Sequence, residues 1–281
     1  MIRQRFSYAV DLARAGVYKE AIAQIVPASL FAVIFNIWFA TDTTLQHSVD
    51  GWWIRDEQDR FDIKLPTPRT AVRFSQQPIS TRLSFVRDKY QLPGFIAVEE
   101  GDTVVDIGTY IGDFTLSVAE DATDVLAIEP DPVSFKALSQ TVAQFDNIRA
   151  ENYLLWEDER SVEFSVATDG SESSIFEPNI GSQDRTETRQ TMRFDSAVDS
   201  PVDFVKVEAE GAELEIVRGF GDREISKIAV DCSEPNPRIG SSPEHEIQES
   251  LTERGYTVEI VEKDIHGTML FARHSEATRQ Q

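Results

Sequence analysis

The sequence predicts an α/β fold in which a mostly parallel sheet is covered by helices on both faces. Apolar runs typical of buried strands alternate with helical patterns along the second half of the chain, and this alternation is typical of parallel sheets. The first such strand, Val104–Ile107, is followed by Gly108 and Gly112 and then by a helical pattern. A strand, a glycine turn and a helix in this order form the ligand-binding edge of an open α/β sheet, so the sequence also predicts a site here.

The glycines and the next strand indicate the kind of ligand. Glycine adopts positive φ and allows a ligand to come close, so Gly108 and Gly112 are expected to leave an open floor at the strand end. About twenty residues further on, the apolar run Val125–Ile128 ends at Glu129, where nucleotide-binding folds have an acid for the ribose hydroxyls. The spacing predicts an adenosine-containing ligand. A purely structural turn is the alternative, because these glycines do not form the dinucleotide-binding motif.

The region before the sheet is predicted to begin with a helical extension. Residues 6–40 have a helical pattern, and residues 21–40 carry no charge although they include Pro27 and Asn36. Twenty uncharged residues are just long enough to span a bilayer. Three interpretations stay open: a membrane span, a membrane-surface or partner-facing helix, or a helix packed on the protein's own core. Because Pro27 and Asn36 interrupt the run, we expect docking on the protein or on a membrane surface.

The remaining elements divide the chain into four segments. These are a helical extension (1–50), a β-hairpin region (51–86) with strands at 61–65 and 71–74, the main α/β domain (87–275) and a polar tail (276–281). In the main domain we predict helices at 83–90, 133–145, after Gly211 and at 244–254, and strands at 150–155, 203–207, 228–231, 257–261 and 268–271. A hairpin of 162–166 with 191–194 brackets a polar loop, 169–190, which is either a flap over the site or a solvated loop.

The composition limits the class of protein and partner. The 281 residues carry 49 acidic and 27 basic side chains, for a formal net charge of −22, and seven of the basic residues are lysine. The acidic side chains repel one another, and molar salt screens this repulsion. The surface is therefore typical of a halophilic protein, with an ordinary acidic cytosolic protein as the alternative. The net negative charge also argues against nucleic acid as a partner, because phosphate groups are bound by clusters of basic residues. With a single cysteine, Cys232, and no evident signal peptide, we expect a cytoplasmic protein.

A second cluster of charged residues follows the predicted strand at 203–207. Lys206 and Glu208 lie on one face of this strand by its period of two, and Glu210 comes two residues later. In the usual topology of such sheets this strand lies next to the first one, so the cluster is expected beside the glycine turn. A solvated turn is the alternative in a chain this acidic.

These motifs resemble those of the FkbM-type, S-adenosylmethionine-dependent methyltransferases. The resemblance covers about residues 87–273 and rests on Val104-Val105-Asp106-Ile107-Gly108-x-x-Ile111-Gly112, on Glu129-Pro130, and on Asp203-Phe204-Val205-Lys206-Val207-x-x-Glu210-Gly211-Ala212-Glu213. It implies a Rossmann-like class I methyltransferase fold with a seven-stranded sheet and an antiparallel final strand. It also implies that S-adenosylmethionine is the cofactor and that the residues of its site are Asp106, Gly108, Tyr110, Gly112 and Glu129.

Three positions depart from the family's pattern. Tyr110 stands where the family usually has Asn, and Glu208 stands where it usually has Asp. Asp231, the acid at the end of the next strand, is followed by Cys232-Ser233 rather than by a histidine. The Tyr110 side chain is compatible with a donor site if it points away from the ligand, and a catalytic role for the Glu208 region is less firmly implied.

The chemistry of methyl transfer suggests candidate catalytic residues. A sulfonium methyl is already activated, so catalysis requires in-line positioning and removal of a proton from the acceptor. We expect Glu208, Glu210 or Asp231 to serve as a carboxylate base with a raised pKa or as a ligand of a divalent metal ion, and Lys206 to orient a carboxylate. His245 and His266 are interpreted as surface or loop histidines, each a less favoured candidate for the base.

The resemblance implies O-methylation of a hydroxyl, and several acceptors remain open. A sugar or glycan is favoured, among them a glycan on a lipid carrier at the inner membrane face, where residues 21–40 would supply a peripheral membrane contact. A soluble small-molecule metabolite is the alternative acceptor. The non-enzymatic alternative is an inactive module that binds the donor or a partner.

Overall fold

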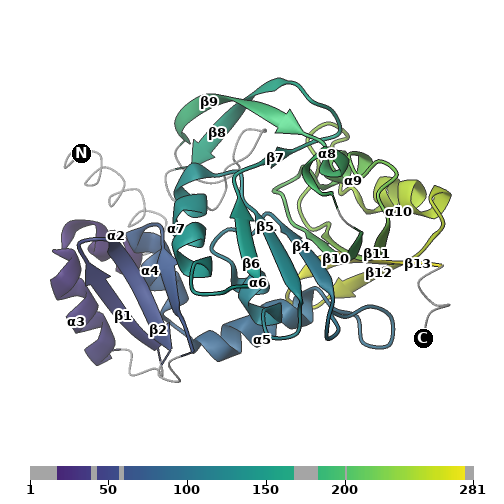
Figure 1. The fold of residues 1–281 in the computed structure, drawn as a ribbon. Coiled ribbons are helices and arrows are strands. Elements are labelled where there is room, and N and C mark those ends of the chain that lie inside the picture. The colour runs from purple at the N-terminus through teal and green to yellow at the C-terminus, as the bar shows by residue number, and fades with distance from the viewer. Residues whose placement is uncertain (1–17, 39–42, 57–59, 168–182, 200, 276–281) are drawn as a thin grey trace.

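The computed structural model describes residues 18–38, 43–56, 60–167, 183–199 and 201–275. A seven-stranded sheet forms the centre of the molecule (Figure 1). Its strands, in the order β12-β13-β11-β10-β4-β5-β6, are β4 (Thr103–Ile107), β5 (Asp124–Ile128), β6 (Ile148–Glu151), β10 (Val202–Val207), β11 (Ile225–Asp231), β12 (Tyr256–Lys263) and β13 (Gly267–His274). The last strand, β13, is antiparallel to β11 and β12, and the pairs from β11 to β6 are parallel. The predicted fold is therefore confirmed.

The strand order reverses beside β4, and this reversal positions the site. The chain runs from β4 outward through β5 to β6 and later returns to pair β10 with the other side of β4. Helices that leave neighbouring strands in opposite directions open a crevice at the carboxyl ends of these strands. The sequence motifs at Gly108, Glu129 and Glu208 all follow strands that end at this crevice.

Two apolar cores cover the two faces of the sheet. Alternate residues of each strand enter opposite cores, as Val104 and Val105 do on β4, because successive strand side chains point to opposite faces. One core includes side chains of α5 (Ile79–Lys89), α6 (Asp113–Val118) and α7 (Pro132–Val142). The other includes side chains of α8 (Phe194–Ala197), α9 (Glu213–Arg218) and α10 (Glu244–Glu253).

A smaller α/β unit precedes the sheet and differs from the predicted hairpin. It contains α2 (Tyr18–Ile25), α3 (Ala28–Trp38), β1 (Thr43–Ser48), β2 (Gly51–Asp56), β3 (Asp62–Leu65) and α4 (Pro68–Phe74). Of the two predicted strands only 61–65 is correct, and it pairs with β2. The prediction of a strand at 71–74 was wrong, because the Thr67 hydroxyl accepts from the Thr70 amide and Pro68 begins a helix. Within the segment assigned to the helical extension (1–50), the residues beyond the helical pattern at 6–40 include a strand, β1.

The described part of the uncharged run, residues 21–38, belongs to two short helices rather than one. The break lies at Val26 and Pro27, and none of the helices in the described ranges is long and apolar enough to cross a membrane. The buried side chains of α3, Phe31, Ala32 and Phe35, pack in the core of this smaller unit. Leu30, Val33 and Ile37 remain exposed on the same helix. Docking on the protein is thus observed for one face, and contact of the other face with a membrane remains a prediction.

Three further strands lie above the carboxyl end of the sheet in Figure 1. These are β7 (Leu154–Leu155), β8 (Ser161–Ala167) and β9 (Gln183–Met192), in the order β7-β9-β8. The predicted strand at 162–166 is present as part of β8, but its predicted partner, 191–194, was wrong: β8 pairs antiparallel with residues 183–190 of β9, Thr191 and Met192 pair with β7, and Phe194 begins α8. Residues 183–190, expected in a polar loop, belong to β9, whereas residues 169–182 of the predicted flap lie outside the described ranges.

Candidate functional site

The turn after β4 brings two strand ends into contact. Gly108 has a φ of 72°, and a Cβ added there would lie 1.6 Å from the carbonyl oxygen of Glu208. Glycine is therefore required because β10 approaches, and not because a ligand takes the place of a side chain. The expectation of an open floor at Gly108 was wrong in this respect. Gly112, with a φ of 94°, begins α6 and packs against Leu138.

Asp106 lies beneath this turn as a buried structural acid. Its Oδ2 accepts hydrogen bonds from the Thr115 amide (3.1 Å) and hydroxyl (2.7 Å), and its Oδ1 lies 3.1 Å from Lys206 Nζ. Burial raises the pKa of Asp106, and the Lys206 charge opposes this shift. Because neither Asp106 nor Gly112 belongs to the described lining of the adjacent cavity, both support the donor site indirectly.

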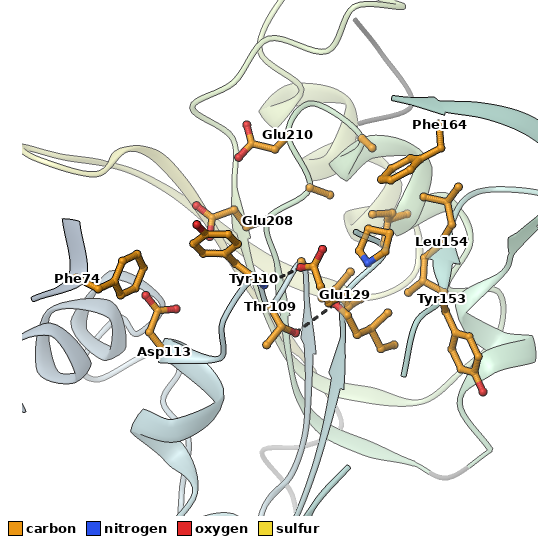
Figure 2. A pocket seen from close by; sticks show the side chains of 18 of the residues that line it. Phe74, Thr109, Tyr110, Asp113, Glu129, Tyr153, Leu154, Phe164, Glu208 and Glu210 are labelled. Carbon is orange, nitrogen blue, oxygen red and sulfur yellow. Dashed lines mark hydrogen bonds between the residues drawn. The ribbon is translucent and has the colours of Figure 1, made fainter. Parts of the chain in front are cut away.

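Glu129 is the acid that the sequence predicted at the end of β5. Its Oε2 accepts a hydrogen bond from the Tyr110 amide (2.6 Å), and its Oε1 accepts one from the Asp131 amide (2.8 Å). The side chain is 5% exposed, and burial raises its pKa to about 8. Figure 2 shows this carboxylate between the turn at Tyr110 and the far wall of the cavity.

Tyr110 contributes its backbone to this arrangement and its side chain to the smaller unit. It has a positive φ of 55°, a conformation that side chains other than Asn and Asp seldom adopt. Its ring packs on Phe74 of α4 with 5.9 Å between the ring centroids, and its hydroxyl lies 2.8 Å from the Thr70 hydroxyl. These contacts hold Tyr110 against α4, so the departure from the usual Asn is compatible with the Glu129 contact.

The cavity that these residues face has a volume of about 260 Å³. We call it the donor cavity. One part of its lining is polar or charged and includes Arg82, Asp113, Glu129, Glu208 and Glu210. The opposite part, apolar side chains that follow β6 or lie on β8 and α9, includes Leu154, Leu155, Phe164 and Ile216. The predicted Gly108, Tyr110, Glu129, Glu208 and Glu210 are thus brought together here (Figure 2).

The remaining charges of the second motif form an ion cluster beside the donor cavity. Lys89 Nζ lies 2.7 Å from Glu208 Oε1 and 2.6 Å from Asp231 Oδ2. The Tyr90 hydroxyl donates to Glu208 Oε2 at 2.5 Å. Lys206 Nζ donates to the carbonyl oxygen of Gly108 at 2.7 Å and lies 3.5 Å from Glu208 Oε2. Lys206 therefore ties the second motif to the glycine turn.

This cluster changes the role expected for Glu208. The ammonium groups of Lys206 and Lys89 and the Tyr90 hydroxyl outweigh the effect of burial and hold the pKa of Glu208 well below its usual range. The expectation of a carboxylate base with a raised pKa was therefore wrong for Glu208. Burial instead raises the pKa of Glu213 to about 7, and this side chain accepts from the amides of Ala209 and Gly211. Glu213 thereby fixes the loop that carries Glu210.

Two of the three carboxylates that sequence analysis considered as metal ligands, Glu208 and Asp231, lie against a lysine. Lys89 Nζ lies between Glu208 and Asp231, and the described part of the chain contains no group of three or more His, Cys, Asp or Glu side chains that could hold a metal ion. Lys89 and Tyr90 come from the end of α5 and were missed, because no local pattern connects them with strand ends more than 100 residues away.

Comparison with known families identifies the chain at this point. Residues 106–258, more than half of the sequence, match the model of the Methyltransferase FkbM domain. The chain belongs to the FkbM methyltransferase family. The matched region includes the first motif from Asp106 onward and the whole second motif. It also includes Lys206, Glu208 and Asp231 of the ion cluster and most of the residues that line the donor cavity.

Individual relatives are distant from this FkbM-family chain. A 55-residue stretch, 20% of the chain and 19% of the relative, is 36% identical to the ribosomal RNA small subunit methyltransferase A of Alkaliphilus oremlandii. The crystal structure of Methyltransferase FkbM from Methylobacillus flagellatus is 14% identical, with a TM-score of 0.46 over 74% of this chain and 54% of that one. TrmK from M. capricolum, solved with S-adenosyl-homocysteine, is 12% identical, with a TM-score of 0.40 over 69% of this chain and 67% of that one. This chain thus spans under a fifth of the curated relative and about half of the FkbM structure.

The other residues singled out in the sequence lie away from the donor cavity. Cys232 is fully buried after β11, and His245 is exposed on α10. His266 lies between β12 and β13 and lines a second cavity together with Lys89, Lys206, Glu208 and Asp231. Arg82 and Asp113, which sequence analysis missed, form a 2.6 Å ion pair where the two cavities meet.

Proposed function

We propose that this protein is an S-adenosylmethionine-dependent O-methyltransferase that acts on a hydroxyl of a sugar or glycan. The observation that carries the proposal is the buried Glu129 carboxylate, which faces a cavity at the switch point of an FkbM-family sheet. Ribose hydroxyls are donors that an acid at this strand end accepts in nucleotide-binding folds. Each Glu129 oxygen accepts one backbone amide and retains further acceptor capacity for such hydroxyls.

The lining of the donor cavity fits the other parts of the donor. The apolar side chains Leu154, Leu155 and Phe164 suit the flat adenine ring, because ligand pockets bury aromatic rings against apolar walls. At the opposite end, Glu208 and Glu210 offer negative charge to a sulfonium. When bound, S-adenosylmethionine supplies an activated methyl group. The protein's own residues then have to orient the acceptor oxygen and accept its proton.

A neutral, hydroxyl-rich acceptor agrees best with the charges beside the donor cavity. Each of Arg82, Lys89 and Lys206 lies within 3.1 Å of at least one acid, so the acceptor meets paired charges and hydrogen-bonding groups. The net charge of −22 disfavours RNA. The exposed Leu30, Val33 and Ile37 of α3 support a cytoplasmic protein that touches the inner membrane surface, where a lipid-linked glycan is assembled.

The test is methyl transfer from S-adenosylmethionine carrying a labelled methyl group to a panel of acceptors. The panel contains neutral glycosides, lipid-linked glycans, hydroxylated small metabolites and RNA. We expect label in a glycoside or glycan as an O-methyl ether, and loss of transfer in Glu129→Ala but not in the exposed-site control Glu120→Gln. Label only in a small metabolite, or only in RNA, would show the acceptor class to be wrong. Donor binding without transfer to any acceptor would identify an inactive donor-binding module.

A further inference from the structure

A second cavity, of about 320 Å³, adjoins the donor cavity. It is bounded by α5, by the carboxyl ends of β10 and β11, and by the loop between β12 and β13. Three residues, Arg82, Asp113 and Glu208, line both cavities. A molecule bound in the second cavity would therefore meet the donor cavity beside Glu208, which lies opposite the adenine-compatible wall of Leu154 and Phe164 (Figure 2).

The loop that closes this second cavity is held in place from both ends. Lys263 Nζ donates to the carbonyl oxygens of Asp88, Lys89 and Gln91, at 2.6, 3.0 and 2.8 Å, and so joins the end of β12 to the end of α5. Gly267 packs so closely that an added Cβ would lie 2.7 Å from the Cβ of Ser233. Between these anchors, the His266 ring packs at a tilt of 55° against Phe85 of α5, with 4.3 Å between ring centroids. The imidazole is thus fixed at the wall of the cavity.

The carboxylates of the second cavity are already engaged with cations or hydroxyls. Glu208 accepts from Lys89 and Tyr90, Asp231 accepts from Lys89 and from the Ser233 amide, and Asp113 pairs with Arg82. Within the described residues, the His266 ring has no hydrogen bond or ion pair of this kind, and it packs against the tilted ring of Phe85. Of the acids and the histidine that line this cavity, His266 is the one whose proton-accepting lone pair is not used in a hydrogen bond or an ion pair with another described residue.

We infer that the second cavity is the acceptor site and that His266 is the general base that removes the proton of the acceptor hydroxyl. The inference rests on the proposed function. In this step the acceptor oxygen forms the new C–O bond as the C–S bond of the sulfonium breaks. Sulfur keeps the electron pair of the broken bond and becomes neutral. The hydroxyl proton passes to the His266 ring, and the resulting imidazolium returns it to solvent through the partly exposed loop.

The surroundings of His266 favour the neutral ring that a base requires. Burial and the positive charges of Lys89 on α5 and Lys263 on β12 lower its pKa from 6.5, while Asp231 after β11 and Glu208 after β10 act in the opposite direction. Arg82 and Asp113, which also face the cavity, are paired with each other. The base is therefore in its active form at neutral pH, and with donor saturating, turnover should fall only at a pH below the ordinary histidine pKa of 6.5.

The test compares His266→Gln and His266→Ala with His245→Gln, a matched change at an exposed helical histidine. With an acceptor identified by the labelled-methyl panel, we expect His266→Gln to lower kcat by about 10²–10⁴-fold, with little change in S-adenosyl-homocysteine affinity. The His245 variant should retain wild-type turnover. Added imidazole should restore part of the activity of His266→Ala, which a merely structural role would not predict.

The pH profile separates this inference from the proposed function. With S-adenosylmethionine kept saturating at every pH, wild-type kcat/KM for the acceptor should fall tenfold per pH unit below the pKa of His266, and His266→Gln should lack this limb. Near wild-type turnover in His266→Gln, or a wild-type profile that stays flat down to about pH 5, would overturn the role of His266 while methyl transfer stands. If His266→Gln loses donor binding through misfolding, the wild-type profile decides alone. Absence of transfer by the wild type to every acceptor would overturn both.

Discussion

Replacing Gly108 with Ala should destabilise the protein far more than replacing Gly112 with Ala. Both glycines have positive φ, 72° and 94°, so each substitution incurs about 1–2 kcal/mol for placing a side chain in a left-handed conformation. At Gly112 the added Cβ would lie 2.9 Å from Leu138 Cδ1, the end of a side chain that can rotate away. The expected total for Gly112→Ala is about 1–3 kcal/mol.

At Gly108 the obstacle is backbone and cannot rotate away. The Cβ would lie 1.6 Å from the Glu208 carbonyl oxygen, whereas an ordinary contact begins at 3.4 Å, so β4 and β10 would have to separate by about 1.8 Å at their ends. That movement also strains the bond from the Glu208 amide to the Ile107 carbonyl (3.1 Å). We expect a loss of about 3–6 kcal/mol in the free energy of unfolding.

Urea denaturation of the two variants and the wild type measures this difference directly. Because whole domains are stable by only about 5–15 kcal/mol, Gly108→Ala should either unfold at much lower urea or fail to fold while Gly112→Ala remains folded. Equal unfolding free energies for the two variants, or a larger loss for Gly112→Ala, would refute the close approach of β4 and β10 described here.

Three further predictions concern the donor, the surface charge and the N-terminal helices. The pKa of Glu129 is about 8 in the ligand-free protein, and hydrogen bonds from ribose hydroxyls favour its ionised form. Calorimetry should therefore show that the affinity for S-adenosyl-homocysteine rises with pH up to about 8 and levels off above it. An affinity that does not change with pH would contradict this. The melting temperature should rise from low salt to molar potassium chloride, because salt screens the net charge of −22; a flat or falling trend would count against a halophilic protein. Carbonate or high-salt washing should release the protein from membranes, whereas a need for detergent would indicate more than peripheral contact by residues 21–40.

The central sheet could be predicted because its signals are local. Val104 and Val105 alternate between two cores, Gly108 and Gly112 mark the turn, and Glu129 ends the neighbouring strand. Each of these features is set by a few consecutive residues, so the order of strands and helices follows from the pattern. The positions of the turn and of the donor cavity were predicted on the same basis.

The predictions that were wrong concern features that depend on contacts between distant segments of the chain. The Ala71–Phe74 run has the alternation of a strand, but the cap at Thr67 and the proline at 68 begin a helix whose buried side chains fill the smaller unit. The lowered pKa of Glu208 results from Lys89 and Tyr90, which lie more than 100 residues earlier. Sequence spacing gave no sign of this pairing, because α5 reaches the ends of β10 and β11 only in the folded chain.

Calorimetric titration of the protein with S-adenosyl-homocysteine tests the central claim most directly, in the wild type and in Glu129→Ala and Glu129→Gln. Above about pH 8, where Glu129 is ionised, the loss of a hydrogen bond to a charged acceptor should cost about 1.5–3 kcal/mol, so Glu129→Ala should bind roughly ten- to a hundredfold more weakly. Glu129→Gln retains the shape of the side chain and one acceptor oxygen and should lose less. The exposed-site control Glu120→Gln, whose parent side chain is 83% exposed, should bind as the wild type does. Equal affinity in the wild type and Glu129→Ala, or no binding by a folded wild type, would contradict a donor site at the ends of β4 and β5.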